Sequence, residues 1–186
     1  MKELSLNILD IAQNSISARA DLIEISIIED ENNMLISIKD NGCGMDEQML
    51  ASVTSPFSTT RKTRNVGLGL PLFKMQAEQT GGWMKIDSVS EKISTTHGTL
   101  VEALFVKTSI DFTPLGNIID TVSALVMSCD QDQNKYDLVF AHKFSGREVI
   151  LDTRELKSIL GDEISLSSPE IITWIREYLA ENYSTK

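Results

Sequence analysis

The stretch MLISIKDNGCGM, residues 34–45, carries the pattern that decides the fold. Apolar and polar residues alternate over 34–40, which predicts a β-strand with one buried face. Gly42 and Gly44 follow, and glycine reaches backbone conformations that other residues avoid, so we expect a tight turn directly after the strand. Residues 22–29, LIEISIIE, alternate in the same way. The two segments therefore predict a β-hairpin whose second strand ends in a glycine-rich turn.

The segments on either side of this hairpin predict an α+β domain. Residues 4–20 place apolar side chains on one wide helical face and Asp10 and Asn14 on the polar face. The elements expected after the turn are a short helix over 46–52, a long polar loop over 53–66, a helix that starts in VGLGLP (66–71) and ends before Gly81, and strands over 83–89 and 99–106. This order predicts a largely antiparallel sheet covered by helices on one face.

The pattern changes after about Lys107. The elements expected there are a helix over 114–129, a second hairpin from strands 136–141 and 147–152, and helices over 153–160 and 168–182. We therefore expect two domains, one over 1–108 and a small α+β domain over 109–186. The second domain carries no chemical motif, so we expect it to be an interaction module.

Composition and charge limit the classes of function. Acidic residues outnumber basic ones, 27 to 17, which gives a net charge of −10. This charge argues against nucleic acid as a partner, and any anionic ligand must be held by backbone amides, glycine loops or a metal ion. The cysteines Cys43 and Cys129 lie far apart, which argues against a disulfide scaffold or a zinc site. No signal peptide and no membrane span are expected, so we expect a cytoplasmic protein without a membrane partner.

Four sequence elements stand in an order that suggests a nucleotide site. They are LDIAQNSISARA (9–20), DNGCGM (40–45), VGLGLP (66–71) and HGT (97–99). Together they resemble the nucleotide-binding motifs of the GHKL ATPases, which include gyrase B, the ninety-kilodalton heat-shock chaperones, histidine kinases, MutL and anti-sigma serine kinases. The resemblance covers about residues 1–107. It implies the Bergerat fold, an α/β sandwich in which ATP lies between the sheet, helices and a lid.

The resemblance assigns binding roles to individual residues on the adenine and metal side. Asn14 matches the asparagine whose amide oxygen binds Mg²⁺, and an amide oxygen is a hard ligand suited to that ion. Asp40 matches the aspartate that accepts a hydrogen bond from the adenine amino group, with Gly42 and Gly44 next to the base. Thr99 matches a threonine near the adenine. The plainer interpretations are a solvated helix face for Asn14, an ordinary turn for Asp40 and a strand-starting residue for Thr99.

The resemblance also assigns phosphate contacts. Gly67, Leu68 and Gly69 match the segment whose backbone amides face the phosphates at the start of a helix, where amides and the helix dipole favour an anion. Thr60, Arg61 and Lys62 match a lid over the nucleotide, with Arg61 or Lys62 near the γ-phosphate. A flexible loop-to-helix junction and a solvated basic loop are the plainer interpretations.

Asp10 occupies the position that decides the chemistry. Hydrolytic members and serine kinases have glutamate there as general base, whereas histidine kinases have asparagine because their partner supplies the nucleophile. Aspartate is one methylene shorter than glutamate, so Asp10 is a candidate base with a shorter reach. ATP hydrolysis, phosphoryl transfer to a protein and ATP-gated binding without catalysis all stay open. We expect ATP or ADP with Mg²⁺ as ligands and an unidentified protein as partner. Homodimerisation is open, and no phosphoacceptor-histidine module is expected.

Overall fold

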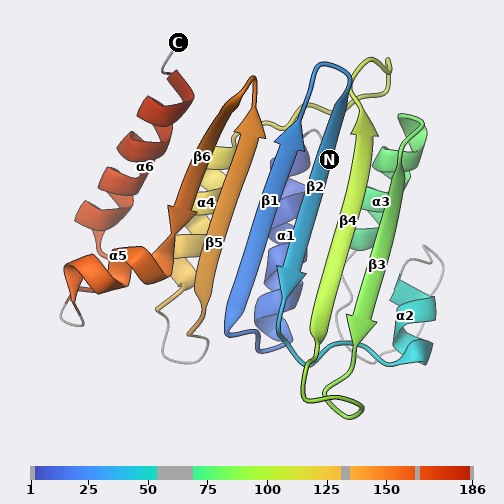
Figure 1. The fold of residues 1–186 in the computed structure, drawn as a ribbon, viewed down its shortest axis with the longest axis horizontal. Helices are drawn as coiled ribbons and strands as arrows, with labels where there is room; N and C mark the ends of the chain where they lie inside the picture. Colours follow the sequence, from blue (N-terminus) through green and yellow to red (C-terminus); the bar gives the residue numbers. More distant parts are fainter. Residues whose placement is uncertain (1–2, 54–68, 131–134, 162–163, 185–186) are drawn as a thin grey trace.

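The computed structural model describes residues 3–53, 69–130, 135–161 and 164–184. The elements in chain order are α1 (Leu4–Ser17), β1 (Leu22–Glu29), β2 (Asn33–Asp40), α2 (Glu47–Val53), α3 (Gly69–Gln79), β3 (Trp83–Val89), β4 (Gly98–Val106), α4 (Ile118–Ser128), β5 (Asp137–Phe144), β6 (Arg147–Asp152), α5 (Thr153–Leu160) and α6 (Pro169–Ser184). Within the described ranges the strands form one sheet in the order β3-β4-β2-β1-β5-β6 (Figure 1).

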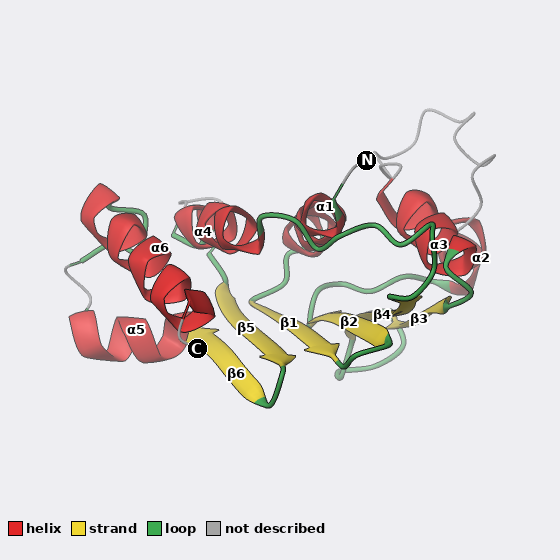
Figure 2. Cartoon of the chain, turned by 90° about the horizontal axis from the view of Figure 1, so that it is seen from above, coloured by secondary structure: helices red, strands yellow, loops and turns green. Residues whose placement is uncertain are grey.

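The sheet is mixed and mostly antiparallel. The pair β1 and β5 is parallel, and every other neighbouring pair is antiparallel. Helices α1, α3, α4 and α6 lie on one side of the sheet, and the opposite side carries no described helix (Figure 2). The predicted fold class, an α+β chain with helices on one face of a largely antiparallel sheet, is confirmed.

Alternating strand residues form the core between these two layers. On β1, Ile23, Ile25 and Ile27 are fully buried toward the helices, whereas Glu24 and Ser26 on the other face are only partly covered. This alternation follows from the two-residue period of a strand. From the helix side, Leu4, Ile8, Ile11 and Ala12 of α1 enter the same core, so α1 packs centrally over the sheet.

The C-terminal segment extends this sheet and core. Strand β5 pairs with β1 along its whole length, from Leu22 opposite Asp137 to Glu29 opposite Phe144. The backbone amide of Ser5 in α1 also donates to the carbonyl oxygen of Leu115, at 2.8 Å. The sheet therefore continues across the boundary expected at residue 108, and the division into two domains stays a prediction. Among the described helices, none is long and apolar enough to cross a bilayer.

Candidate functional site

Two predicted site residues from distant segments meet where β2 ends and β4 begins. Asp40, the last residue of β2, lies directly opposite Thr99 in the register of the β2–β4 pair. The turn that follows Asp40 also contacts the end of α1, because the Cys43 amide donates to the Ala18 carbonyl oxygen at 2.9 Å. These segments gather at the lower end of the sheet in Figure 1. The fold therefore assembles the motif residues of α1, β2 and β4 into one place.

The Asp40 carboxylate is held by two hydrogen bonds from different segments. Ser15 Oγ on α1 donates to Asp40 Oδ2 at 2.6 Å, and the Gly42 amide donates to Oδ1 at 2.9 Å. A carboxylate has about four acceptor positions, so each oxygen can accept a further hydrogen bond. Asp40 is only half-buried. The arrangement is a fixed acceptor that an amino group of a ligand could reach.

The backbone passes so close at two glycines that no side chain fits. At Gly44, where φ is +64°, a Cβ would lie 1.9 Å from the Val89 carbonyl oxygen. At Gly98, where φ is +138°, a Cβ would lie 2.0 Å from the Asp40 carbonyl oxygen. Both the conformation and the contact require glycine. The turn after β2 is therefore packed backbone to backbone against the β3–β4 hairpin.

Side chains of the β3–β4 hairpin also hold the turn in place through hydrogen bonds. Ser88 Oγ accepts a hydrogen bond from the Met45 amide at 2.8 Å and lies 2.9 Å from Thr99 Oγ1. His97 Nδ1 lies 2.6 Å from the Gly42 carbonyl oxygen. A carbonyl oxygen only accepts, so Nδ1 carries the proton in this hydrogen bond. The turn that supports Asp40 is thereby held on both sides before any ligand binds.

Two further predicted site residues, Asp10 and Asn14, lie on α1. Asp10 and Asn14 lie one helical turn apart and are both half-buried. Gly69, the first residue of α3, is so near that a Cβ there would lie 3.0 Å from Asp10 Cβ. The amides of the first helical turn have no partner within the helix, and they and the helix dipole favour an anion. The structure thus places the start of α3 beside Asp10, one helical turn before Asn14 on α1.

Five predicted contacts, Thr60, Arg61, Lys62, Gly67 and Leu68, lie outside the described residues and stay predictions. Three supporting residues, Ser15, Ser88 and His97, were not assigned to the site from the sequence. Ser15 had one usable signal: it lies next to Asn14 but falls on the buried face of α1, where a hydroxyl needs a partner.

A second polar cluster lies at the opposite end of β1. His142 is almost fully buried, with Nδ1 2.8 Å from the Tyr183 hydroxyl. Its Nε2 lies 3.2 Å from Glu29 Oε1 but lacks the alignment of a hydrogen bond, and Lys107 Nζ pairs with Glu29 Oε2 at 2.9 Å. Burial lowers the pKa of His142, against the opposing effect of the Glu29 carboxylate.

Two surface hollows, of about 350 and 300 Å³, border Glu29 and do not reach Asp40. Residue chemistry therefore locates the candidate site better than hollow size does.

Comparison with known proteins agrees with this geometry. Residues 1–109 match the family described as histidine kinase-, DNA gyrase B- and HSP90-like ATPase. The chain belongs to this family. The match contains every predicted site residue, from Asp10 to Thr99. The expected GHKL membership is confirmed, and residues 1–109 form an ATP-binding domain of the type found in histidine kinases.

Individual relatives share only this part of the chain. A sensor protein of Shewanella frigidimarina is 34% identical over 106 residues, which are 56% of this chain and 15% of that protein. Sporulation kinase C of Bacillus subtilis is 32% identical over 94 residues, 50% of this chain and 21% of that protein. The solved mycobacterial sensor histidine kinase MprB superposes with a TM-score of 0.42 at 21% identity, over 54% of this chain and 69% of that one. The chain thus spans about a fifth or less of the length of these two relatives.

Proposed function

We propose that this ATPase-family domain binds Mg-ATP in a Bergerat-type pocket and transfers the γ-phosphoryl group to a protein partner. The observation that carries the proposal is the fixed Asp40 carboxylate, paired with Thr99 and hydrogen-bonded by Ser15, at the same end of the molecule as Asp10, Asn14 and the start of α3. The free cysteines Cys43 and Cys129 suit a reducing compartment, and we place the protein in the cytoplasm.

The adenine end of the pocket is assigned to Asp40 and its turn. An acceptor fixed by Ser15 and by the Gly42 amide favours a base with an exocyclic amino group at that position, which adenine has. Guanine presents a carbonyl oxygen there, and two facing acceptors repel each other. Thr99, next to Asp40 in the sheet, supplies a hydroxyl to the same edge. The pocket therefore selects ATP over GTP.

The phosphate end is assigned to the flank of α1 and the start of α3. The first-turn amides of α3 favour the phosphates, Asn14 would bind the magnesium ion, and bound Mg²⁺ would neutralise charge on the phosphates. The Asp10 carboxylate would repel the phosphates of the nucleotide, and the charge of a bound metal ion would offset this repulsion. We assign Asp10 the role of proton acceptor from the attacking group, and Thr60, Arg61, Lys62, Gly67 and Leu68 the remaining phosphate contacts.

Incubation with γ-labelled ATP tests the proposal. The full chain is mixed with an extract of its native cell, and label is followed on protein and as free phosphate. We expect label on a protein of the extract, and loss of that label when Asp10 is replaced by Asn. If the label appears only as free phosphate, the chain is a slow ATPase and does not transfer to protein. If neither labelled product forms, transfer is refuted as well. Sedimentation with and without nucleotide tests whether the active form is a homodimer.

A further inference from the structure

The outer face of α6 presents an aromatic pair beyond the family segment. Ile175 and Leu179 of this helix are fully buried, and α6 packs with them against the core. Trp174 points away from that contact and keeps 47% of its surface exposed. Its ring stacks on Tyr178, with centroids 5.4 Å apart and planes inclined by 15°. A large stacked aromatic surface that remains open to solvent is typical of an interaction site.

The aromatic pair is fixed to the edge of the sheet. Tyr178 donates its hydroxyl hydrogen to the Ile150 carbonyl oxygen of β6 at 3.0 Å, and β6 is the last strand of the sheet. Ile150 is itself 46% exposed. The hydroxyl already uses one lone pair of this edge carbonyl, which makes it a poorer acceptor for a partner strand and favours a partner that binds through side chains. The same hydrogen bond sets the orientation of the platform.

Unpaired carboxylates flank the platform. Glu170 and Glu177 lie four residues before and three after Trp174, so they share its face of the helix, and both are exposed. Neither has an ion-pair partner within the described ranges. The neighbouring cation Arg176 is engaged instead, because its guanidinium contacts Asp120. Figure 1 places α6 at the outer edge of the molecule, and the exposure of Trp174, Glu170 and Glu177 shows that this face is accessible.

We propose that this platform, formed by Trp174, Tyr178, Ile150, Glu170 and Glu177, docks an arginine-bearing segment of a partner protein. A guanidinium group stacks on an indole ring and is attracted by its π-system, and it bonds carboxylates through paired donors. Nucleic acid or an anionic membrane would meet like charge. A symmetric second copy would place the same carboxylates against each other, which disfavours a homodimer through this face.

Peptide binding tests the proposal on the full chain. The probe is a fluorescently labelled helical peptide of Ala and Leu with Arg at every fourth position, followed by anisotropy. Two comparison peptides carry Lys or Glu in place of Arg. We expect saturable binding that weakens with salt, in the order Arg, then Lys, with none for Glu. Trp174→Ala should weaken binding at least tenfold.

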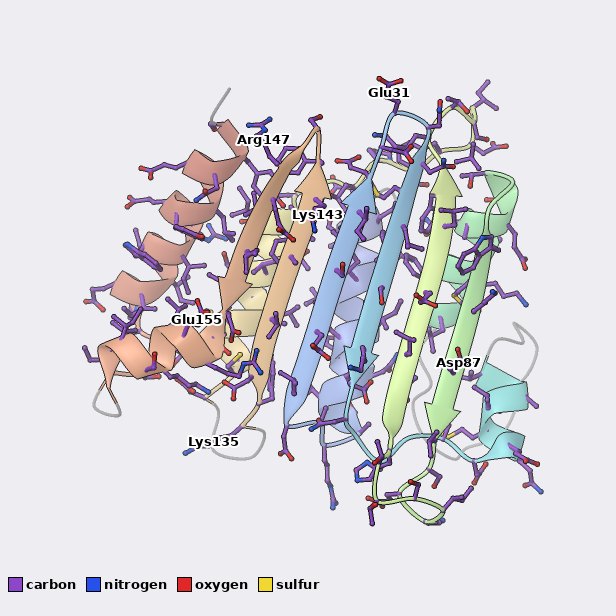
Figure 3. All side chains as sticks on the ribbon, in the orientation of Figure 1. Glu31, Asp87, Lys135, Lys143, Arg147 and Glu155 are labelled. Carbon is purple, nitrogen blue, oxygen red and sulfur yellow. The ribbon has the colours of Figure 1, made fainter. Side chains whose placement is uncertain are left out.

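Charge variants provide the matched comparison. The double variant Glu170→Gln with Glu177→Gln should weaken Arg-peptide binding roughly three- to tenfold, the range expected for two exposed ion pairs. The control, Glu31→Gln with Asp87→Asn, removes the same charge from positions far from α6 (Figure 3). Equal weakening in both double variants would overturn the proposal, as would equal affinity for the Glu peptide. A dimer in sedimentation that Trp174→Ala dissociates would overturn it in favour of self-association. Because Trp174 is half exposed, unchanged circular dichroism should accompany each variant.

Discussion

Replacing Gly44 by alanine should damage both stability and nucleotide binding. The left-handed conformation at this residue, with φ +64°, costs an alanine about 1–2 kcal/mol. The added Cβ would also lie 1.9 Å from the Val89 carbonyl oxygen, so the turn must move away from β3. That movement separates the Met45 amide from Ser88 Oγ, a partly buried hydrogen bond worth about 1 kcal/mol. We expect a total loss of about 2–3 kcal/mol in the free energy of unfolding.

Gly146→Ala is the matched control. Gly146 also has positive φ, +75°, but a Cβ there would meet nothing within 4 Å. Its loss should stay at about 1–2 kcal/mol, with ADP affinity unchanged. Urea unfolding gives the stability of each variant, and calorimetry gives its affinity for ADP. Equal losses of stability in the two variants, or full ADP affinity in Gly44→Ala, would refute the close packing of the turn as the basis of the site.

Three further changes have distinct expected outcomes. Ser15→Ala removes the 2.6 Å hydrogen bond that orients Asp40, and ADP affinity measured by calorimetry should fall roughly tenfold, with unchanged affinity counting against a positioning role. Asp10→Asn should reduce phosphate transfer or release about 10²–10⁴-fold in the labelled-ATP assay while ATP binding persists; full activity would exclude a base role. The pKa of His142 is lowered in the folded chain, so the unfolded chain binds the proton more tightly, and the free energy of unfolding should fall as the pH drops below about 6.5. Urea unfolding of His142→Gln at several pH values should show no such fall.

The local elements of this fold were predictable, but their partners were not. The strands at 22–29 and 34–40 show a clean two-residue alternation, and the structure has them at Leu22–Glu29 and Asn33–Asp40. The position of β5 beside β1 could not be read in the same way. Strand pairing depends on contacts between distant segments, and an alternating pattern is compatible with several neighbours. The sheet continues across the boundary expected at 108, and the division into two domains stays a prediction.

In the site too, some residues were predictable from the sequence and the contacts that orient them were not. The resemblance to the GHKL ATPases placed both Asp40 and Thr99 near the adenine, and the register of β2 and β4 puts them opposite each other. The residues that orient this pair were missed because their contacts bridge long stretches of chain. Ser15 reaches Asp40 across 25 residues, and His97 reaches Gly42 across 55. Ser15 falls on the buried face of α1, where a hydroxyl needs a partner, but the sequence does not say which residue that partner is.

Calorimetric titration of ATP with Mg²⁺ into the wild type and into Asp40→Asn tests the central claim most directly. The asparagine keeps the size of the side chain but can direct an amide donor at the amino group of adenine. We predict clear binding to the wild type and a loss of roughly 10²-fold or more in the variant, because a donor facing a donor leaves both unpaired. Circular dichroism and urea unfolding would verify that the variant is folded. Equal affinity of the two proteins for ATP would contradict the assignment of this pocket to adenine.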